Sequence, residues 1–419
     1  MAKLRPFATA NEALIPENLP GPWFTKILST FLIFKLFFFK NLNIKTTNIS
    51  KFSLLLTNSL VYDLLPSMIL NKTLSFAASI IKLAIVIFLI TNINAEEINS
   101  KYYSEDSGTL SIMYHRFNEN KYPSTNIQTD IFKKQIDLIR NKKIKFLDPE
   151  NFALNFNIPK SEKKILITID DGFTSFYNHA WPILKKEKIP FLLFISTETI
   201  GKNGYMNWEQ IKEVEKENFA YIGNHSHSHE YMINFTFEKF KKDIETSINI
   251  FKKELGYNPI FFSYPFGEYS NEQKKHISER FQFAFGQNSG VIDVNKNRFE
   301  LPRFPINEKY GDLERFKFLI NLLPLQYKKI KPEDKYVLKN YNPPKLIIEF
   351  FEDQKNLKNI NCFSNEGNIW AKSEIELSDN ILKVNFREKF NFRRGRINCS
   401  LNDDKGWRWL GIQFTIEEN

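Results

Sequence analysis

The sequence has few cysteines and histidines. Its 419 residues include 2 cysteines and 6 histidines. Its lysines are scattered, without an arginine-rich block or a basic aromatic repeat, so we expect no nucleic-acid partner. The net charge of +10 can still attract an anionic polymer or a membrane surface. Because 42% of the residues are hydrophobic and 15% aromatic, a disordered chain is excluded, and there is material for one large domain and a smaller one.

The apolar runs are too short to span a bilayer comfortably. Residues 79–95, "SIIKLAIVIFLITNINA", combine a lysine, a short apolar core and a polar stretch ending in Ala95, which is the layout of a secretory signal. The alternative is an uncleaved anchor that holds the protein at the membrane. A signal stands at the start of its chain, so within the N-terminal extension 1–95 we hypothesise that synthesis begins at Met68. We therefore expect an exported protein, periplasmic or extracellular, either free or membrane-anchored.

The two cysteines, Cys362 and Cys399, both lie near the C-terminus. In an exported protein they can form one disulfide. Two unpaired buried thiols are the alternative.

From residue 108 to about 310 the sequence alternates between strand and helix patterns. β-rich runs such as "TLSIMY", "ILITI" and "FLLFIS" are followed by stretches with apolar residues at helical spacing, such as 129–143. Repeated βα units imply a parallel sheet, and a run of this length favours a closed or nearly closed barrel. We therefore predict an α/β domain over 108–310.

Past residue 330 short β runs such as "ILKVNF" and "WLGIQFTI" alternate with polar turns. They predict a small all-β, sandwich-like domain over 341–419. Prolines and lysines over 311–340 predict a linker. Trp370, Trp407 and Trp409 either stack on sugars or form the sandwich core, and core is the commoner arrangement.

Side chains able to do chemistry stand at the C-terminal ends of four predicted strands. In parallel βα architectures catalytic groups collect at these ends, because the loops that follow the strands do not have to pack in the core. Four of the six histidines fall at these ends. The residues are Tyr114 and His115; Asp170 and Asp171; His225, His227 and His229; and Tyr264, Pro265, Phe266 and Gly267.

The segment "HSHSH", residues 225–229, can bind a divalent metal ion. His225 and His229 are four positions apart, which puts both imidazoles on one side of a helical turn or tight loop. A spacing of two suits an extended segment, so His227 is the ambiguous member. With one carboxylate, two histidines make a three-ligand set that leaves positions open for water and substrate. Taken alone, the segment is equally compatible with a polar surface loop.

The segment "TIDDG", residues 168–172, supplies two adjacent carboxylates. One can bind the metal while the other, its neighbour's charge absorbed by the cation, stays ionised and accepts a proton from the attacking water. Gly172 permits the tight turn that aims both side chains at the mouth of the sheet. The alternative is a turn that merely ends a strand.

Together these motifs resemble those of the polysaccharide deacetylase family, also called the NodB-homology domain or carbohydrate esterase family four. "TIDDG" is similar to the family's first motif, "HSHSH" to its second and "YPFG", residues 264–267, to its third. The resemblance covers about 108–310 and implies a deformed parallel (β/α) barrel. It implies that Asp170 is the catalytic base and that Asp171, His225 and His229 are the metal ligands. It also implies that "YPFG" surrounds the oxyanion, with the backbone N–H of Phe266 as donor.

The chain departs from the family pattern at two places. Many members open the third motif with an arginine, where this chain has Ser263. Many also carry a late histidine as general acid, but here the only later one is His276, in a helical pattern that favours a surface position. The run "MYHRF", residues 113–117, is instead similar to the exported poly-N-acetylglucosamine deacetylase branch, where the last motif appears first in the chain. His115 is then the candidate acid, with a histidine satisfied in a strand-end network as the alternative.

The sequence "LPRFPI", residues 301–306, also resembles that branch. Its Arg303 is a candidate to orient the base carboxylate or to contact sugar.

The resemblance implies hydrolysis of N-acetyl groups from amino sugars of a cell-envelope or exopolysaccharide, with one divalent ion, Zn²⁺, as the expected cofactor. Two alternatives stay open. A glycoside hydrolase also uses two carboxylates, although adjacent aspartates fit it poorly because its carboxyl groups stand about 5 Å or more apart. A catalytically inactive carbohydrate-binding protein on the same fold is compatible with the missing arginine.

Overall fold

A computed structural model describes residues 107–158, 162–293, 296–352 and 354–418. The signal-like segment 79–95, Met68 and the rest of the N-terminal extension lie outside these residues. Within the described ranges, no helix is both long and apolar enough to cross a membrane.

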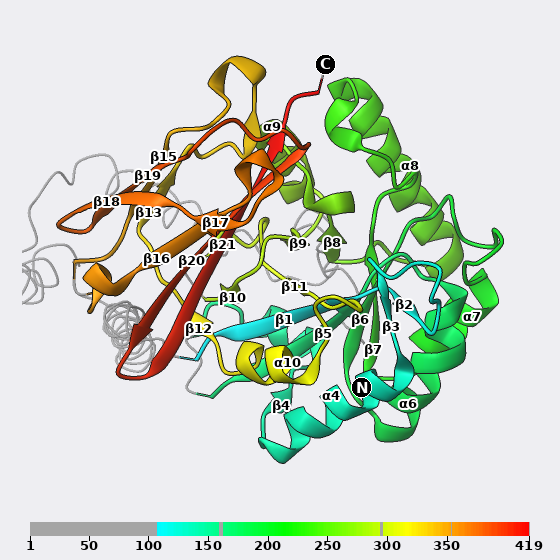
Figure 1. Ribbon diagram of the computed structural model, residues 1–419. Helices are drawn as coiled ribbons and strands as arrows, with labels where there is room; N and C mark the ends of the chain where they lie inside the picture. The colour runs from blue at the N-terminus through cyan, green and yellow to red at the C-terminus, as the bar shows by residue number, and fades with distance from the viewer. Residues whose placement is uncertain (1–106, 159–161, 294–295, 353, 419) are drawn as a thin grey trace, which may run out of the picture. The chain divides into compact units, whose positions relative to one another are not determined.

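The first part of the described chain builds a curved sheet of mainly parallel strands (Figure 1). The order along it is β10-β1-β5-β6-β7-β8-β9, and each neighbouring pair from β1 to β9 is parallel. On the other edge of β1, β10 pairs antiparallel and β11 parallel, while β4 pairs with β5. The strands are β1 (Thr109–Tyr114), β4 (Lys145–Phe146), β5 (Lys164–Ile169), β6 (Phe191–Ile195), β7 (Ala220–Asn224), β8 (Phe261–Ser263), β9 (Phe283–Phe285), β10 (Val291–Ile292) and β11 (Phe304–Pro305). A separate short parallel pair joins β2 (Arg116–Phe117) to β3 (Asn126–Ile127).

Helices supply the crossovers that parallel strands require. They are α4 (Thr129–Asn141), α5 (Pro149–Leu154), α6 (Trp181–Glu187), α7 (Trp208–Glu215), α8 (Phe237–Leu255) and α9 (Asn271–Ser278), with a π-helical turn at Phe176–Ala180. Capping boxes begin α7 at Asn207 and α9 at Ser270, which satisfies N–H groups that a helix start leaves unpaired.

Alternate residues of the buried strands pack on opposite faces of the sheet, because successive strand side chains point to opposite sides. Ile112, Ile167 and Leu193 pack with α4, α6 and α7 in the largest core. The other face carries a second, aromatic core, which includes Leu166, Leu192, Phe194, Phe261, Phe283 and Phe285. The predicted α/β architecture with a parallel sheet is confirmed, and between β9 and β10 the sheet stays open in the described residues.

The C-terminal part is a two-sheet β domain, as predicted. In the described ranges, one sheet runs β12-β21-β20-β16-β17, with β14 also on β21, and the other runs β13-β15-β19-β18. Ile348, Leu382 and Phe414 are among the side chains that form their common core. The strands are β12 (Leu323–Pro324), β13 (Lys329–Lys331), β14 (Tyr336–Val337), β15 (Leu346–Glu349), β16 (Asn361–Ser364), β17 (Ala371–Lys372), β18 (Glu374–Ser378), β19 (Ile381–Asn385), β20 (Arg394–Asp403) and β21 (Gly406–Ile416).

The segment 311–340, predicted as a linker, is built into the fold instead. It begins with α10 (Leu313–Leu319), whose Phe316 and Leu319 pack in the core of the parallel sheet. It continues with β12, β13 and β14, which pair with strands of the β domain. The sequence pattern did not predict these strands, because each strand has only two or three residues and the segment around them is rich in lysine and proline.

Cys362 and Cys399 form a disulfide between β16 and β20. The two residues stand directly opposite in the antiparallel register, with 4.0 Å between their Cα atoms. The sequence is compatible with a disulfide or with two unpaired thiols, and the structure contains the disulfide.

His276 is not a surface residue. Its side chain is 5% exposed on α9 and lies against the rings of Phe237 and Phe240, with centroids 5.8 and 5.7 Å away. The helical pattern gave its position on α9 but not the aromatic residues of α8 that cover it.

Candidate active site

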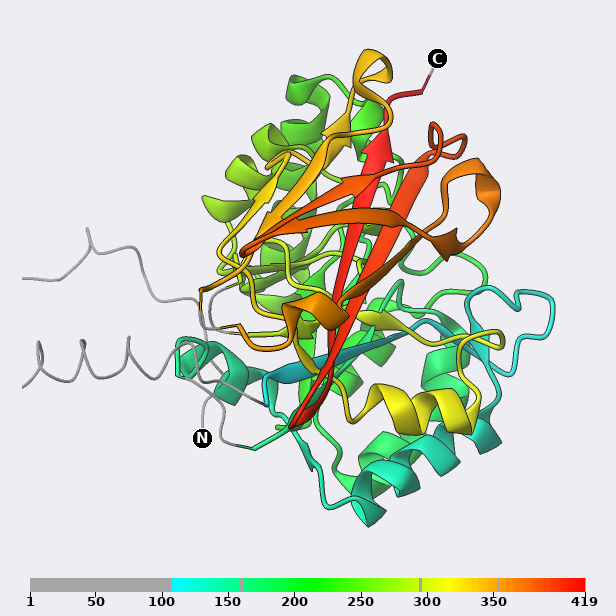
Figure 2. The same cartoon turned by 60° about the vertical axis from the view of Figure 1, so that its left-hand side comes forward.

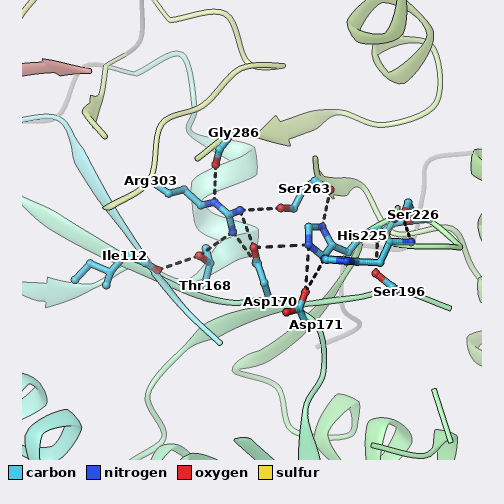
Figure 3. Close-up of polar contacts among 12 residues, drawn as sticks. Ile112, Thr168, Asp170, Asp171, Ser196, His225, Ser226, Ser263, Gly286 and Arg303 are labelled. Carbon is cyan, nitrogen blue, oxygen red and sulfur yellow. Dashed lines mark hydrogen bonds and ion pairs between the residues drawn. The ribbon is translucent and has the colours of Figure 1, made fainter. Parts of the chain in front are cut away.

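The C-terminal ends of β5 and β7 bring the predicted acidic and histidine side chains together (Figure 3). Asp170 and Asp171 directly follow β5, and His225 directly follows β7. Asp171 and His229 adopt left-handed backbone conformations, with φ of 74° and 54°, which are uncommon for residues with a side chain and often mark functional sites. Gly172 also has a positive φ, 69°, and a Cβ there would lie 2.9 Å from a neighbouring side chain, so the turn requires glycine.

Asp171, His225 and His229 form a group that can hold a metal ion. One ligand atom of each lies within 4.8 Å of the others. Asp171 Oδ1 is 3.0 Å from His229 Nε2 and 3.4 Å from His225 Nε2. Asp171 and His225 are buried, whereas His229 is partly exposed. The group is therefore open to solvent on the side of His229.

The hydrogen bonding of His225 favours a cation in this group. Its Nδ1 lies 2.7 Å from the carbonyl oxygen of Ser263, which can only accept, so Nδ1 carries the proton. Nε2 of the neutral ring is then an acceptor that faces another acceptor, Asp171 Oδ1. Both atoms are buried without a hydrogen-bond partner. A divalent cation bound by both removes this conflict, so the residues fit a metal site.

Asp170 is held by a buried guanidinium. Arg303 Nη1 and Nη2 donate to its two carboxylate oxygens at 2.7 and 2.8 Å, and both side chains are fully buried. Arg303 is fixed in turn by the carbonyl oxygen of Gly286 at 2.9 Å and the hydroxyl of Ser263 at 2.8 Å (Figure 3). Ser263 stands where many family members have an arginine. In this chain a guanidinium reaches the same place from Arg303, just before β11.

The surroundings of the two carboxylates keep both ionised. Burial alone would raise the pKa of Asp170, but the charge of Arg303 and its hydrogen bonds to the carboxylate outweigh this effect, so the pKa lies below its ordinary value. Burial also acts to raise the pKa of Asp171, and there the neighbouring His229 more than offsets it. Asp170 is therefore a carboxylate at neutral pH, able to accept a proton.

His115 follows β1 and lines the same cleft as Asp171 and His229. Burial lowers the pKa of its imidazole, and the attraction of Asp171 and Asp170 only partly offsets that effect. The imidazole thus lines the cleft together with Asp171 and is influenced by the charge of both carboxylates.

The segment "YPFG" only partly faces the cleft. Phe266 lines it with a left-handed backbone, φ 59°, and its ring lies 5.0 Å from the ring of His229. Tyr264 and Pro265 are buried outside the cleft lining, and the hydroxyl of Tyr264 donates to the carbonyl oxygen of Phe299 at 3.1 Å. Tyr264 is therefore a core residue, and its side chain makes no contact with the cleft. At Gly267 a Cβ would lie 2.5 Å from the backbone nitrogen of Gln287, so only glycine fits.

His227, the ambiguous member of "HSHSH", lies apart from the metal group. Its Nδ1 is 2.9 Å from the hydroxyl of Thr197. Its backbone N–H donates to Asp243 at 2.8 Å. His227 thus holds the loop through hydrogen bonds, while His225 and His229 lie next to Asp171.

The cleft above the metal group encloses about 1920 Å³, including space open to solvent, and the C-terminal domain forms part of its wall. Trp370 and Trp409 line the cleft, and neither belongs to the sandwich core. The expectation that these tryptophans form the sandwich core is therefore wrong for both. Trp407 is 43% exposed outside the cleft. Arg394 and Arg396 on β20 also line the cleft, and the sequence did not single them out.

These residues form a polar site at the C-terminal edge of a curved parallel sheet. Residues 157–283 match the family described as polysaccharide deacetylase. The matched part of the chain contains "TIDDG", "HSHSH" and "YPFG", so the match agrees with the resemblance of these motifs.

Several named proteins are similar to this chain. The poly-β-1,6-N-acetyl-D-glucosamine N-deacetylase of Staphylococcus epidermidis is 23% identical over 245 residues, covering 52% of this chain and 85% of that protein. The enzyme of the same name from Staphylococcus aureus strain N315 is 24% identical over 235 residues, covering 49% and 81%. Among solved structures, IcaB from Ammonifex degensii has a TM-score of 0.46 and 25% identity, covering 51% of this chain and 97% of that one. The Streptococcus pyogenes deacetylase PplD in complex with acetate has a TM-score of 0.45 and 22% identity, covering 49% and 95%.

Proposed function

We propose that this protein is a metal-dependent polysaccharide deacetylase, which hydrolyses N-acetyl groups of amino sugars in a cell-envelope polysaccharide or exopolysaccharide. The observation that carries the proposal is the pairing of Asp170 with Arg303 directly beside the group of Asp171, His225 and His229. The names of the staphylococcal relatives support N-acetylglucosamine as the sugar.

Asp171, His225 and His229 would hold the ion, for which we expect Zn²⁺, a common partner of imidazole and carboxylate ligands. When bound, such an ion polarises a carbonyl oxygen and lowers the pKa of water toward about 7.

The chain's own residues would move the protons. Asp170 accepts a proton from the attacking water, and Arg303 keeps this carboxylate ionised and fixed in orientation. The backbone N–H of Phe266 is the proposed donor to the oxyanion, a contact typically worth about 3 kcal/mol. His115, in its protonated form, gives a proton to the departing amine nitrogen and becomes neutral, because an unprotonated amine is a very poor leaving group.

Two alternatives are less well supported. Asp170 and Asp171 are neighbours in sequence and one is locked to Arg303, so they do not flank a glycosidic bond as glycoside hydrolysis requires. The inactive binding protein was favoured by the missing arginine at Ser263, and Arg303 now supplies a guanidinium there.

We also propose that the protein is exported, periplasmic or extracellular. The disulfide between Cys362 and Cys399 supports this, because such bonds persist in oxidising compartments. Anchoring at a membrane through the N-terminal segment stays a prediction, since that segment lies outside the described residues.

A panel of N-acetylated polysaccharides and peptidoglycan fragments tests the function. We expect released acetate without new reducing ends, abolished by a chelator and restored by Zn²⁺. New reducing ends would instead identify a glycoside hydrolase. Binding without either product would identify a carbohydrate-binding protein and contradict the proposal.

A further inference from the structure

The outer face of β20 forms a wall of the cleft above the metal group. Along this strand Ile397 and Cys399 point into the sandwich core. Because strand side chains alternate, Arg394, Arg396 and Asn398 point the other way, and all three line the cleft. The C-terminal domain therefore contributes side chains to the same cleft as the proposed catalytic residues.

Hydrogen bonds fix this wall to the loops around the site. Gln413 on β21 donates to the carbonyl oxygens of Phe266 and Gly267 at 3.0 and 3.2 Å. The same side chain accepts from Arg396 Nε at 3.0 Å. The wall and the loop proposed to hold the oxyanion are thus linked through one glutamine. In Figure 2 the hairpin of β20 and β21 is the pair of long strands drawn in red and red-orange.

A second set of hydrogen bonds joins the hairpin of β20 and β21 to Asn288 and Ser289. The hydroxyl of Ser289 donates to Asn398 at 2.8 Å and accepts from the indole of Trp409 at 2.9 Å. The side chain of Asn288 donates to the carbonyl oxygen of Gly411 at 3.0 Å. The indole of Trp409 is consequently held in place at the edge of the cleft.

The cleft lining is strongly cationic. Asp171 is its only carboxylate within the described residues, and that group is the proposed metal ligand. The cations that line it are Lys309, Arg315, Arg394 and Arg396. A wall of this composition attracts negative charge and repels positive charge.

Arg396 and Arg394 stand on the same face of β20, and only Arg394 has a carboxylate partner within ion-pair distance among the described residues. Arg394 lies 3.7 Å from Glu268, which is also paired with Arg393 at 2.8 Å. For Arg396 no carboxylate of the described chain lies within ion-pair distance, and its Nε–H donates to the neutral Gln413. Burial and the neighbouring Arg394 lower the pKa of Arg396 to about 10, so it remains a cation at neutral pH. An anion at this place would relieve the burial of an uncompensated charge.

We propose that Arg396 and Arg394 form a subsite for an anionic group of the polysaccharide, a carboxylate or a phosphate, on a sugar near the one that loses its acetyl group. Trp370 and Trp409 line the same cleft, where aromatic faces can pack against sugar rings. The inference rests on the proposed function and narrows it to acidic polysaccharides. It also implies that stretches already deacetylated, whose amines are cationic, leave the cleft readily.

Calorimetry of the metal-loaded protein tests the subsite with three oligomers of equal length. The neutral probe is the hexamer of N-acetylglucosamine, the carboxylate probe is a hyaluronan hexasaccharide and the phosphate probe is an oligomer of N-acetylglucosamine 1-phosphate. We expect one acidic probe to bind about tenfold more tightly than the neutral one, because a charge-assisted hydrogen bond contributes on that scale. The two acidic arms distinguish carboxylate from phosphate.

Arg396→Gln should remove most of this preference, measured within one protein as the ratio of its affinity for the acidic probe to its affinity for the neutral hexamer. Arg394→Gln provides a second variant that keeps the Arg396–Gln413 contact. Lys383→Gln, an exposed lysine on β19 outside the cleft lining, removes the same charge and should change nothing. Equal affinities for all three probes, or an undiminished preference in both arginine variants, would overturn the proposal. Acetate release measured in parallel separates this failure from that of the proposed function: acetate released from a neutral substrate supports the deacetylase function whatever the charge preference.

Discussion

Replacing Arg303 with methionine tests the pairing on which the proposed base depends. Methionine has a similar length and no charge, so it leaves the buried carboxylate of Asp170 without its two hydrogen bonds of 2.7 and 2.8 Å. Gly286 and Ser263 also lose their donor. Asp170 has no compensating exposure to water, because its side chain is 0% exposed.

Removing one partner of a buried ion pair typically lowers the free energy of unfolding by about 3–5 kcal/mol. The full burial of both Arg303 and Asp170 puts the expected loss in this range at neutral pH. The same change should abolish most turnover, since a carboxylate that is protonated cannot act as a base.

The pH dependence of this loss has a definite sign. In the wild type the pKa of Asp170 is lowered, so its contribution to stability is present above the unfolded pKa and disappears as pH falls through the folded one. Without Arg303, burial is the dominant effect and should raise the pKa above the unfolded value. The stability difference between the two proteins should therefore be largest near neutral pH and narrow in acid, and the acid limb of the rate profile should move to higher pH.

Urea unfolding of the metal-free proteins between pH 4 and 8 measures this difference. Arg140→Met is the matched control, because Arg140 forms a surface ion pair with Glu187, and such pairs contribute about 1 kcal/mol or less. Equal unfolding free energies for the Arg303 variant and the wild type at neutral pH, with an unmoved acid limb, would refute the reasoning.

Three further predictions concern the histidines and the disulfide. His229→Ala should lose the metal, measured by elemental analysis, whereas His227→Ala should keep it because His227 faces Thr197; full occupancy without His229 would contradict the ligand assignment. His115→Ala should retain the metal and lose turnover, and unchanged acetate release would exclude it as the acid. Replacing Cys362 and Cys399 together by alanine should lower the free energy of unfolding by about 4 kcal/mol on the chain-entropy model, given their separation of 37 residues; an unchanged urea midpoint would speak against the bridge.

The arrangement of the site was predictable where it depends on strand order. Asp170 and His225 could be expected together, because they follow parallel strands whose carboxyl ends share one edge of a sheet. The periodicity also gave the α/β architecture and the two-sheet C-terminal domain. Local pattern is sufficient for such features, since buried strands and their following loops are continuous in sequence.

Features that depend on long-range packing were not predictable. Arg303 lies 133 residues after Asp170, so its role was one option among several until the fold brought the two together. The burial of His276 depends on α8, and the exposure of Trp370 depends on how the β domain meets the cleft. The role of Arg396 was equally hidden. Alternation along β20 predicts that its side chain points away from the sandwich core, but not that this side of the strand lines the cleft.

The most direct test of the account is the comparison of Asp170→Asn with Asp171→Asn for bound metal and acetate release. Asp170→Asn should keep the metal and lose most turnover, because an amide preserves the shape and cannot accept the proton. Asp171→Asn should lose metal first, with activity partly recovered at high Zn²⁺ concentration. The reverse pattern would exchange the two roles, and near-normal acetate release with full metal in both variants would contradict the proposed mechanism.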